Sequence, residues 1–512
     1  MDSDVASRIA KNSLFNLSST VVGIPLMLFL TPFVLGYLGN EEFGIWALVG
    51  VISSYAQLSE FGISESLVKF IAEYQTRNDT LRLNQLINTA LVIYLILSSI
   101  FCILFILSLP FIVDTILNIP PDLRDKAAYV FTVGLILFFV NLLTGIFSSL
   151  VKGFQRMEFS NGITIISLVL TALGTIIVLH RGYGLIGLIY NNACITPIII
   201  VLNVIAAKRL FPEMKLNPFR YFNRETLNVI WRFSWKIQVS NITQLLVFQI
   251  DRILLSHYIG LEAVSFYEIA NRIAFQGRNL IVSIFSPMIP AASSLQAQHA
   301  HDVITGLYRR SFKYMSIITI PFSFLIIALA HPFINIWMGS GFETSAFTIQ
   351  FLMIVYMTNL LTGPGSFILS GINKPHIGMI SSVFAGILNL FLCLLFVKWI
   401  GYYGIIIGIF ASISTSGFIF IWLIHKNIPD LDWGMYREYL STPIALAVSF
   451  AACLYLLILI LPINGYSMIL ILGFCYMALF YSFIFRGNYL DDFDRSMINK
   501  LNPLRSKKHE NQ

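Results

Sequence analysis

The apolar stretch from residue 262 to residue 290 carries residues that could bind a charged group: Glu268, Asn271, Arg272 and Arg278. On a helix, Glu268 and Arg272 are four residues apart with the glutamate first, so their side chains share a face and can form an ion pair. Arg278 has no acidic residue at helical spacing. Two interpretations stay open: a neutralised pair that holds this helix to a neighbour, or a polar cavity in which an arginine meets an anionic group.

A second group of polar side chains lies in the preceding apolar stretch, residues 232–256. Most of them fall on one helical stripe, which in a membrane helix is the inward face. They could line a cavity or hydrogen-bond to neighbouring helices, and the sequence leaves both interpretations open. For Asp251 and Arg252, an ion pair at the membrane interface and a gate are the alternatives. The members are Ser234, Gln238, Asn241, Gln244 and Asp251, and Arg252 directly follows the last of them.

The first half of the chain carries fewer such groups. Asn16 and Gln57 are its polar cavity candidates, and Glu60 and Glu65 lie toward the inner end of their apolar stretch. The two carboxylates could titrate in a proton-coupled cycle, or could pair with Lys69 and other cations at the inner surface. The five cysteines are isolated, and no P-loop, GxSxG or HExxH motif occurs. We therefore expect no metal site, no cofactor and no enzymatic activity.

The composition identifies the elements that must position these groups. The 512 residues are 57% hydrophobic and only 12% charged, whereas soluble proteins carry about 25% charged residues. The apolar segments are long enough to cross a membrane as helices, and helices suit such runs better than barrel strands. The sequence predicts an all-α polytopic membrane protein with fourteen spans, at approximately 14–37, 43–68, 86–113, 128–150, 159–180, 184–206, 232–256, 262–290, 314–337, 346–370, 376–398, 402–424, 440–461 and 466–485.

Lysine and arginine are distributed unevenly over the alternate loops. With the N-terminus inside, 24 basic residues fall on the inner side and only four on the outer side. This bias predicts that both termini are cytoplasmic. It also accounts for the net charge of +7, so we expect no nucleic-acid partner. Membrane lipids are the partners that the basic inner surface suits.

The segment YLGNE at residues 37–41 recurs 221 residues later as YIGLE at residues 258–262. Two further pairs of similar segments follow at nearly the same offset, in the loops after the fourth and tenth spans and at the start of the sixth and twelfth. A repeat of six spans keeps its orientation in the membrane, and substrate sites of such transporters lie between the halves. The charges around the second copy are absent around the first. We therefore expect the cavity to be specialised in the second half.

The repeat also divides the chain into expected domains. Spans 13 and 14 fall outside it, and a long basic segment lies between its two copies. Within the tenth span, Thr362-Gly363-Pro364-Gly365 predicts a break in the helix, because glycines flank the proline. The expected domains are an N-terminal six-helix bundle at 1–206, a cytoplasmic linker at 207–231, a second six-helix bundle at 232–430, an additional helix pair at 431–486 and a basic cytoplasmic tail at 487–512.

Short motifs resemble those of a known family. LGNEEFG at residues 38–44, followed by FGISESL at residues 61–67, is similar to the signature of Wzx-type polysaccharide flippases. These belong to the MATE-like multidrug/oligosaccharidyl-lipid/polysaccharide superfamily. DRILL at residues 251–255 resembles the matching element of the second half, and the resemblance covers most of residues 8–430.

The resemblance implies two six-helix bundles in a V around a central cavity. It implies transfer of an undecaprenyl-diphosphate-linked oligosaccharide between the leaflets of a bacterial inner membrane by alternating access, for O-antigen, capsule or exopolysaccharide synthesis. A polysaccharide polymerase and a chain-length regulator are candidate protein partners. Arg272 and Arg278 are the residues expected to bind the diphosphate, since a guanidinium binds phosphate through paired hydrogen bonds.

Three other interpretations were weighed. Fourteen spans, rather than the twelve of many Wzx members, is closer to the lipid II flippase branch. A cation-coupled drug exporter of the same superfamily would be expected to have a mainly acidic cavity in the half that binds the drug. A non-transporting scaffold for glycan assembly would have little reason to keep arginine in the middle of the membrane.

Overall fold

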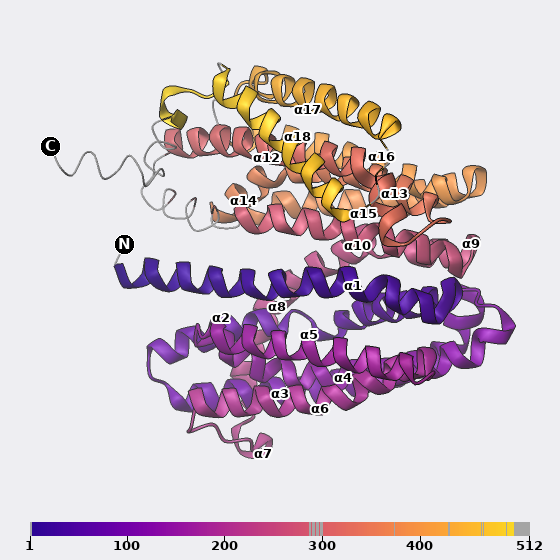
Figure 1. The fold of residues 1–512 in the computed structure, drawn as a ribbon. Coiled ribbons are helices and arrows are strands. Elements are labelled where there is room, and N and C mark those ends of the chain that lie inside the picture. Colours follow the sequence, from indigo (N-terminus) through magenta and orange to yellow (C-terminus); the bar gives the residue numbers. More distant parts are fainter. Residues whose placement is uncertain are drawn as a thin grey trace. The chain divides into compact units, whose positions relative to one another are not determined.

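The computed structural model describes residues 3–285, 288, 292, 296, 301–372, 374–428, 431–461, 463, 465–487 and 489–495 (Figure 1). The side chains of residues 3–18, 236, 237, 240, 301, 302 and 375 lie outside this description. The described residues form helices and turns and contain no strand, as the all-α prediction requires.

The helices keep the order expected from the apolar segments. Their bounds are α1 Ser3–Ala56, α2 Ile63–Thr76, α3 Thr80–Phe111, α4 Pro121–Gly153, α5 Met157–His180, α6 Gly184–Leu210, α7 Pro218–Tyr221, α8 Arg224–Phe248, α9 Ile250–Tyr258, α10 Leu261–Phe285, α12 His301–Trp337, α13 Glu343–Leu361, α14 Gly363–Gly371, α15 Pro375–Ile400, α16 Tyr402–Asn427, α17 Gly434–Ile460 and α18 Tyr466–Arg486.

Eleven helical segments of the described residues are long and apolar enough to cross a membrane. One of them, Ser19–Glu60, covers most of the first predicted span and most of the second. Gly39 separates the two, because its φ of 73° and ψ of 175° are not helical. The predicted span at 232–256 and residues 262–285 of the next one are helical as α8, α9 and α10 but are more polar and are not among the eleven, and most of residues 286–290 lie outside the described residues. The predicted count of fourteen is consistent with these helices.

The helices group into two compact units. The first comprises Met1–Ile269 with Ser382–Ile409, and the second comprises Ala270–Ser381 with Phe410–Gln512. The expected domains divide the chain differently, at the linker 207–231 and at residue 430, and those boundaries stay a prediction.

In the first unit, the span predicted at 43–68 is not a single helix. Helix α1 ends at Ala56, a single 3₁₀ turn covers Gln57–Glu60, and α2 begins at Ile63. The cause is the backbone between them: Phe61 (φ 51°) and Gly62 (φ 69°) are both left-handed, a conformation that ends a right-handed helix. The break starts α2 at a new position, and its apolar face joins a buried cluster with α3 and α4.

In the second unit, α12 packs against α13, α14, α17 and α18. The break predicted near Thr362 is confirmed, since α13 ends at Leu361 and α14 begins at Gly363. Helices α17 and α18, whose sequence carries no charged residue between Tyr439 and Phe485, bury apolar side chains against α12 in two clusters. The segment after α18 is also fixed: Asp494 is buried and accepts hydrogen bonds from Lys313 and Tyr314 of α12.

Candidate functional site

The break between α1 and α2 exposes backbone carbonyl groups that side chains of α8 bind. Ser234 Oγ donates to the carbonyl of Gly62 at 3.2 Å, and Gln238 Nε2 donates to the carbonyl of Leu58 at 2.8 Å. Part of the predicted polar stripe therefore forms helix–helix hydrogen bonds. The other amide atom of Gln238, Oε1, is buried and has no hydrogen-bond partner in the described part of the chain.

A polar pocket of about 530 Å³ lies beside the same break, inside the first unit. Gln57, Glu60 and Glu65, three of the predicted residues, line it together with Lys152 of α4. Glu60 is buried and accepts a hydrogen bond from Tyr94 at 3.3 Å. The pocket thus gathers two carboxylates and one ammonium group, which can exchange protons or bind a small cation.

From the sequence, the second alternative was that these carboxylates pair with Lys69 and other cations at the inner surface. The Lys69 ammonium lies over the ring of Phe233, with 4.3 Å between Nζ and the ring centroid. The positive charge that faces the carboxylates comes from Lys152, one helix away.

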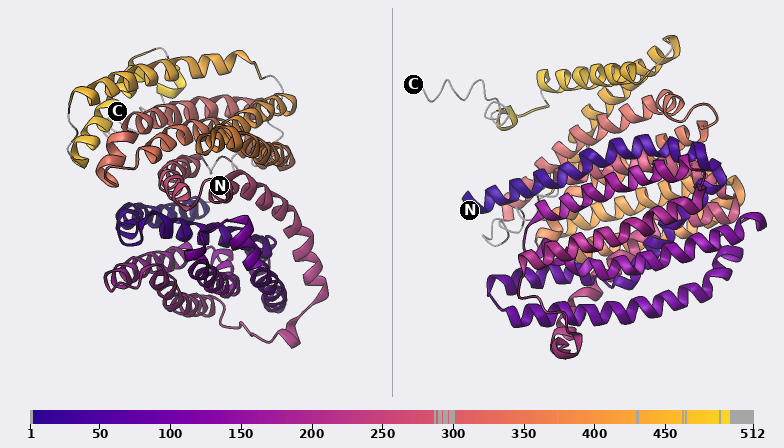
Figure 2. Two further views of the ribbon diagram at one scale, coloured as in Figure 1. Left: turned by 90° about the vertical axis from the view of Figure 1, so that its right-hand side faces the viewer. Right: turned by 60° about the horizontal axis from the view of Figure 1, so that its bottom comes forward.

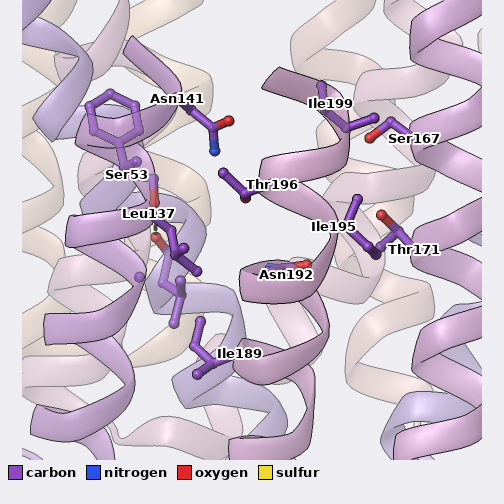
Figure 3. Close-up of a pocket in the computed structure, with 13 residues that line it drawn as sticks. Ser53, Leu137, Asn141, Ser167, Thr171, Ile189, Asn192, Ile195, Thr196 and Ile199 are labelled. Carbon is purple, nitrogen blue, oxygen red and sulfur yellow. Dashed lines mark hydrogen bonds between the residues drawn. The ribbon is translucent and has the colours of Figure 1, made fainter. Parts of the chain in front are cut away.

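A second pocket, of about 300 Å³, lies further along the first unit between α1, α4, α5 and α6 (Figure 3). The two pockets share Phe138 and Asn141 as lining residues. The polar groups of the second pocket are neutral amides and hydroxyls. They belong to Ser53, Asn141, Ser167, Thr171, Asn192 and Thr196.

Asp251 and Arg252, also in the first unit, lie just after the interruption between α8 and α9 and have different partners. Asp251 accepts from Tyr267 at 3.0 Å and from Asn389 of α15 at 3.2 Å. Arg252 Nε donates to Glu268 Oε2 at 2.8 Å, and its Nη1 donates to the carbonyl of Phe248. Asn389 also donates to the carbonyl of Leu246.

Arg252 and Asn389 therefore satisfy backbone carbonyls at the discontinuity between α8 and α9. Backbone groups that a break leaves inside apolar surroundings must be satisfied by other groups. An interfacial ion pair and a gate were the two alternatives for Asp251 and Arg252. The structure forms an ion pair between Arg252 and Glu268 of α10.

Arg278 belongs to the second unit and is held by amides. Its Nε donates to Asn359 Oδ1 of α13 at 2.9 Å, and its Nη1 donates to Asn279 Oδ1 at 3.3 Å. Asn271, one of the predicted cavity residues, is buried and accepts from Tyr356 at 2.7 Å. Residues of α13 thus orient polar side chains of α10 along about two helical turns.

The remaining predicted residues lie on α1, α8 and α10. Arg272 is half-buried on α10, Asn241 is half-buried on α8 and Gln244 is exposed. Asn16 lies within α1, and its side chain is outside the described residues.

Sequence reasoning missed the neutral pocket and most of the partners. Asn141 is a single amide in an apolar helix, and nothing in its spacing distinguishes it. Tyr94, Asn359 and Asn389 act through partners 34 to 138 residues away in the chain. The one available signal was the run of consecutive asparagines, Asn191-Asn192, in the middle of an otherwise apolar helix.

Comparison with known proteins identifies the family. A model of the family described as polysaccharide biosynthesis protein matches residues 9–296, more than half of the chain. The chain belongs to this family. A second model, described as MatE, matches residues 237–395. The Wzx-type, MATE-like resemblance expected from residues 38–44 and 61–67 is confirmed.

Curated relatives match the chain over most of its length. It is similar to the uncharacterised membrane protein EpsK of Bacillus subtilis, with 22% identity over 85% of this chain and 86% of EpsK. It is also similar to a candidate O-antigen transporter of Shigella flexneri, with 21% identity over 69% of this chain and 82% of that protein.

Solved structures show the fold. The lipid II flippase MurJ, in an inward closed conformation, matches with a TM-score of 0.71 at 13% identity, covering 93% of this chain and 99% of MurJ. An inward-facing MATE-family transporter matches with a TM-score of 0.69 at 15% identity, covering 80% and 98%. The family and these neighbours are transporters and flippases rather than enzymes.

Proposed function

We propose that this protein moves an undecaprenyl-diphosphate-linked oligosaccharide from the cytoplasmic to the outer leaflet of a bacterial inner membrane, with both termini in the cytoplasm. The family match over residues 9–296 carries the proposal. Two similar proteins support the cargo class, the candidate O-antigen transporter and the lipid II flippase. A diphosphate-sugar headgroup needs such a carrier, because burying charge in hydrocarbon without partners is costly.

Arg272 and Arg278 are the proposed ligands of the diphosphate. A guanidinium binds phosphate best when its plane is fixed, because two parallel hydrogen bonds then need no further ordering. The hydrogen bond from Arg278 Nε to Asn359 supports this role, because it fixes the plane of that guanidinium. The same proposal gives Glu268 and Asn271 supporting roles on the same helix.

The pocket with Glu60, Glu65 and Lys152 is the proposed coupling site. Its two carboxylates lie beside a non-helical turn, where a change of charge can alter the turn at residues 57–62. Gln57, in that turn, is proposed to bind the same cation or water.

Deletion of the gene followed by lipid analysis tests the cargo. We expect the lipid-linked oligosaccharide to accumulate on the cytoplasmic leaflet and surface glycan to disappear. Normal surface glycan together with altered drug sensitivity would contradict the proposal.

A cation-coupled drug exporter is the second candidate. The MatE match over residues 237–395 and the carboxylates of the pocket favour it. Efflux of cationic drugs from cells that overproduce the protein decides between the two functions, since a dedicated lipid flippase leaves efflux unchanged.

A further inference from the structure

The segment between α6 and α8 is fastened to α3 of the same unit. Asn84 Nδ2 donates to the carbonyl of Glu213 at 3.2 Å, and Asn84 Oδ1 accepts from the amide of Lys215 at 2.7 Å. One turn later, Asn88 donates to the carbonyl of Lys215 at 2.7 Å and accepts from the amide of Asn217 at 2.8 Å. Two amide side chains therefore hold an extended backbone as a neighbouring strand would.

The fastening continues to the start of α8. The amide of Asn223 donates to Thr89 Oγ1 at 3.1 Å, and the Asn223 side chain caps the first turn of α8. Phe211 and Met214 are buried in the same cluster as α2 and α3. Residues 211–223, which we call the strap, are thus a fixed part of the first unit rather than a loose tether.

The strap presents apolar side chains outward at its short helix α7. Phe219 is fully exposed, at 103% of its reference area, and Leu216 and Phe222 are exposed at 49% and 45%. Figures 1 and 2 show α7 projecting from the first unit beside α3. A phenylalanine that is fully exposed on a fixed segment is expected to contact an apolar partner other than water, because burying such a ring is strongly favourable.

Basic side chains surround these apolar residues. Lys215, Arg220 and Arg224 are all exposed. The next turns of α8 expose Trp231 and Trp235, each at 50%. Tryptophan is enriched at the level of lipid headgroups, and aromatic residues mixed with cations are typical of segments that lie in the membrane interface.

We propose that the strap is a membrane-surface anchor, in which Phe219, Leu216 and Phe222 enter the lipid headgroup region and Lys215, Arg220 and Arg224 bind phosphates of anionic lipids. The anchor ties the first unit to one membrane surface, which is the cytoplasmic one in the proposed topology. The charge complementarity between basic side chains and an anionic surface favours lipid over a protein partner. The proposal is independent of the transported cargo.

The test uses the purified full-length chain in vesicles. The exposed Cys194, Cys453 and Cys475 are changed to alanine, and an environment-sensitive NBD label is attached through Phe219→Cys. In vesicles that contain phosphatidylglycerol, we expect the emission to shift to shorter wavelength and to be quenched by nitroxide-labelled lipid headgroups but not by aqueous iodide. A label at the exposed Asp122, at the start of α4 and distant in sequence from the strap, serves as the water-facing control.

Charge is tested separately from apolar insertion. The triple change Lys215→Gln, Arg220→Gln and Arg224→Gln should abolish the difference between phosphatidylglycerol and pure phosphatidylcholine vesicles. Arg77→Gln, at an exposed arginine that already pairs with Glu73, is the matched control and should leave the difference intact.

Unlabelled protein gives a second readout. Hydrogen exchange of residues 215–223 should be slower in nanodiscs with phosphatidylglycerol than with phosphatidylcholine, and Phe219→Asp should remove this difference. Equal emission and equal iodide quenching in both lipids would overturn the proposal. A wavelength shift that appears only after addition of a cytosolic protein extract would overturn it as well, in favour of a protein partner.

Discussion

The side chain of Asn40 donates a hydrogen bond to Glu262, with 2.9 Å between Nδ2 and Oε1. The two residues belong to the two copies of the repeated motif, at residues 37–41 and 258–262. Ser265 also donates to the carbonyl of Asn40, and a Cβ at Gly44 would collide with the carbonyl of Leu261. The two copies of the short motif therefore contact each other directly.

Replacing Asn40 with aspartate should weaken this contact, because two carboxylates would then face each other. At a partly exposed site we expect a loss of about 1 kcal/mol, or roughly a fivefold change in the population of the state that contains the contact. If alternating access separates the two motifs, export of surface glycan should fall. Surface glycan measured at equal membrane abundance of the protein checks this.

The reciprocal change provides the control. Asn40→Asp combined with Glu262→Gln restores one donor and one acceptor, so export should recover. Glu41→Gln, at an exposed neighbour, should have no effect. Failure of the double variant to recover would show that the motif acts through something other than this hydrogen bond.

The two proposed phosphate ligands can be separated by mutation. On an ideal helix, residues six apart point about 120° from each other, so Arg272 and Arg278 need not contribute equally. We expect Arg278→Ala to abolish export, and Arg278→Lys to restore little of it, because lysine cannot form the paired hydrogen bonds. Asn359→Leu should reduce export partly by freeing the guanidinium plane.

Arg486→Ala, at an exposed arginine that ends α18, is the control for loss of one positive charge. Each variant is compared by surface glycan and by its amount in the membrane fraction. Normal export by both Arg272→Ala and Arg278→Ala would rule out the proposed phosphate site.

The sequence predicts a helix break only where the residues force one. Gly363 and Pro364 predict the break between α13 and α14, since proline lacks the amide hydrogen and glycine is flexible. The break at Phe61-Gly62 was missed, because its left-handed phenylalanine has no signal in an apolar run. Its stability depends on Ser234 and Gln238, which lie more than 170 residues away in the chain.

The candidate site was predictable in its residue types but not in its pairing. Hydropathy singled out Glu60, Glu65 and Arg278, because charge in an apolar segment is rare whatever its partner. The partner is set by tertiary packing: Glu268 forms an ion pair with Arg252 of α9, which the helical spacing between Glu268 and Arg272 does not predict. The spacing of residues within one helix cannot show which other helix packs against it.

Neutralising Glu65 tests the coupling site. Glu65 and Lys152 line one pocket, so Glu65→Gln removes a proton-binding group and leaves Glu60 as the remaining carboxylate beside the ammonium of Lys152. We expect transport in proteoliposomes to lose its dependence on an imposed pH gradient while substrate binding persists. Glu73→Gln, at an exposed glutamate of the same helix, is the control. Unchanged dependence on the gradient in both Glu60→Gln and Glu65→Gln would exclude these carboxylates from coupling.

The tail after α18 is expected to undock when Asp494 loses its charge. Lys313 and Asp494 are both buried, with exposures of 5% and 2%, and removing one partner of a buried pair costs about 3 kcal/mol. Because residues 489–495 can leave α12, the expected result of Asp494→Asn is faster hydrogen exchange in this segment rather than unfolding of the helices. Asp492→Asn, at an exposed neighbour, should change nothing.

Acid should release the same segment. Burial alone would raise the pKa of Asp494, but hydrogen bonds from Lys313 and Tyr314 outweigh it and hold the pKa below its ordinary value. A carboxyl whose folded pKa is depressed contributes stability above its unfolded value, about 3.9, and loses it as the pH falls through the folded pKa. Docking should therefore be constant near neutrality and weaken only below about pH 4. Hydrogen exchange corrected for intrinsic rate measures this; release between pH 5 and 7 would contradict it.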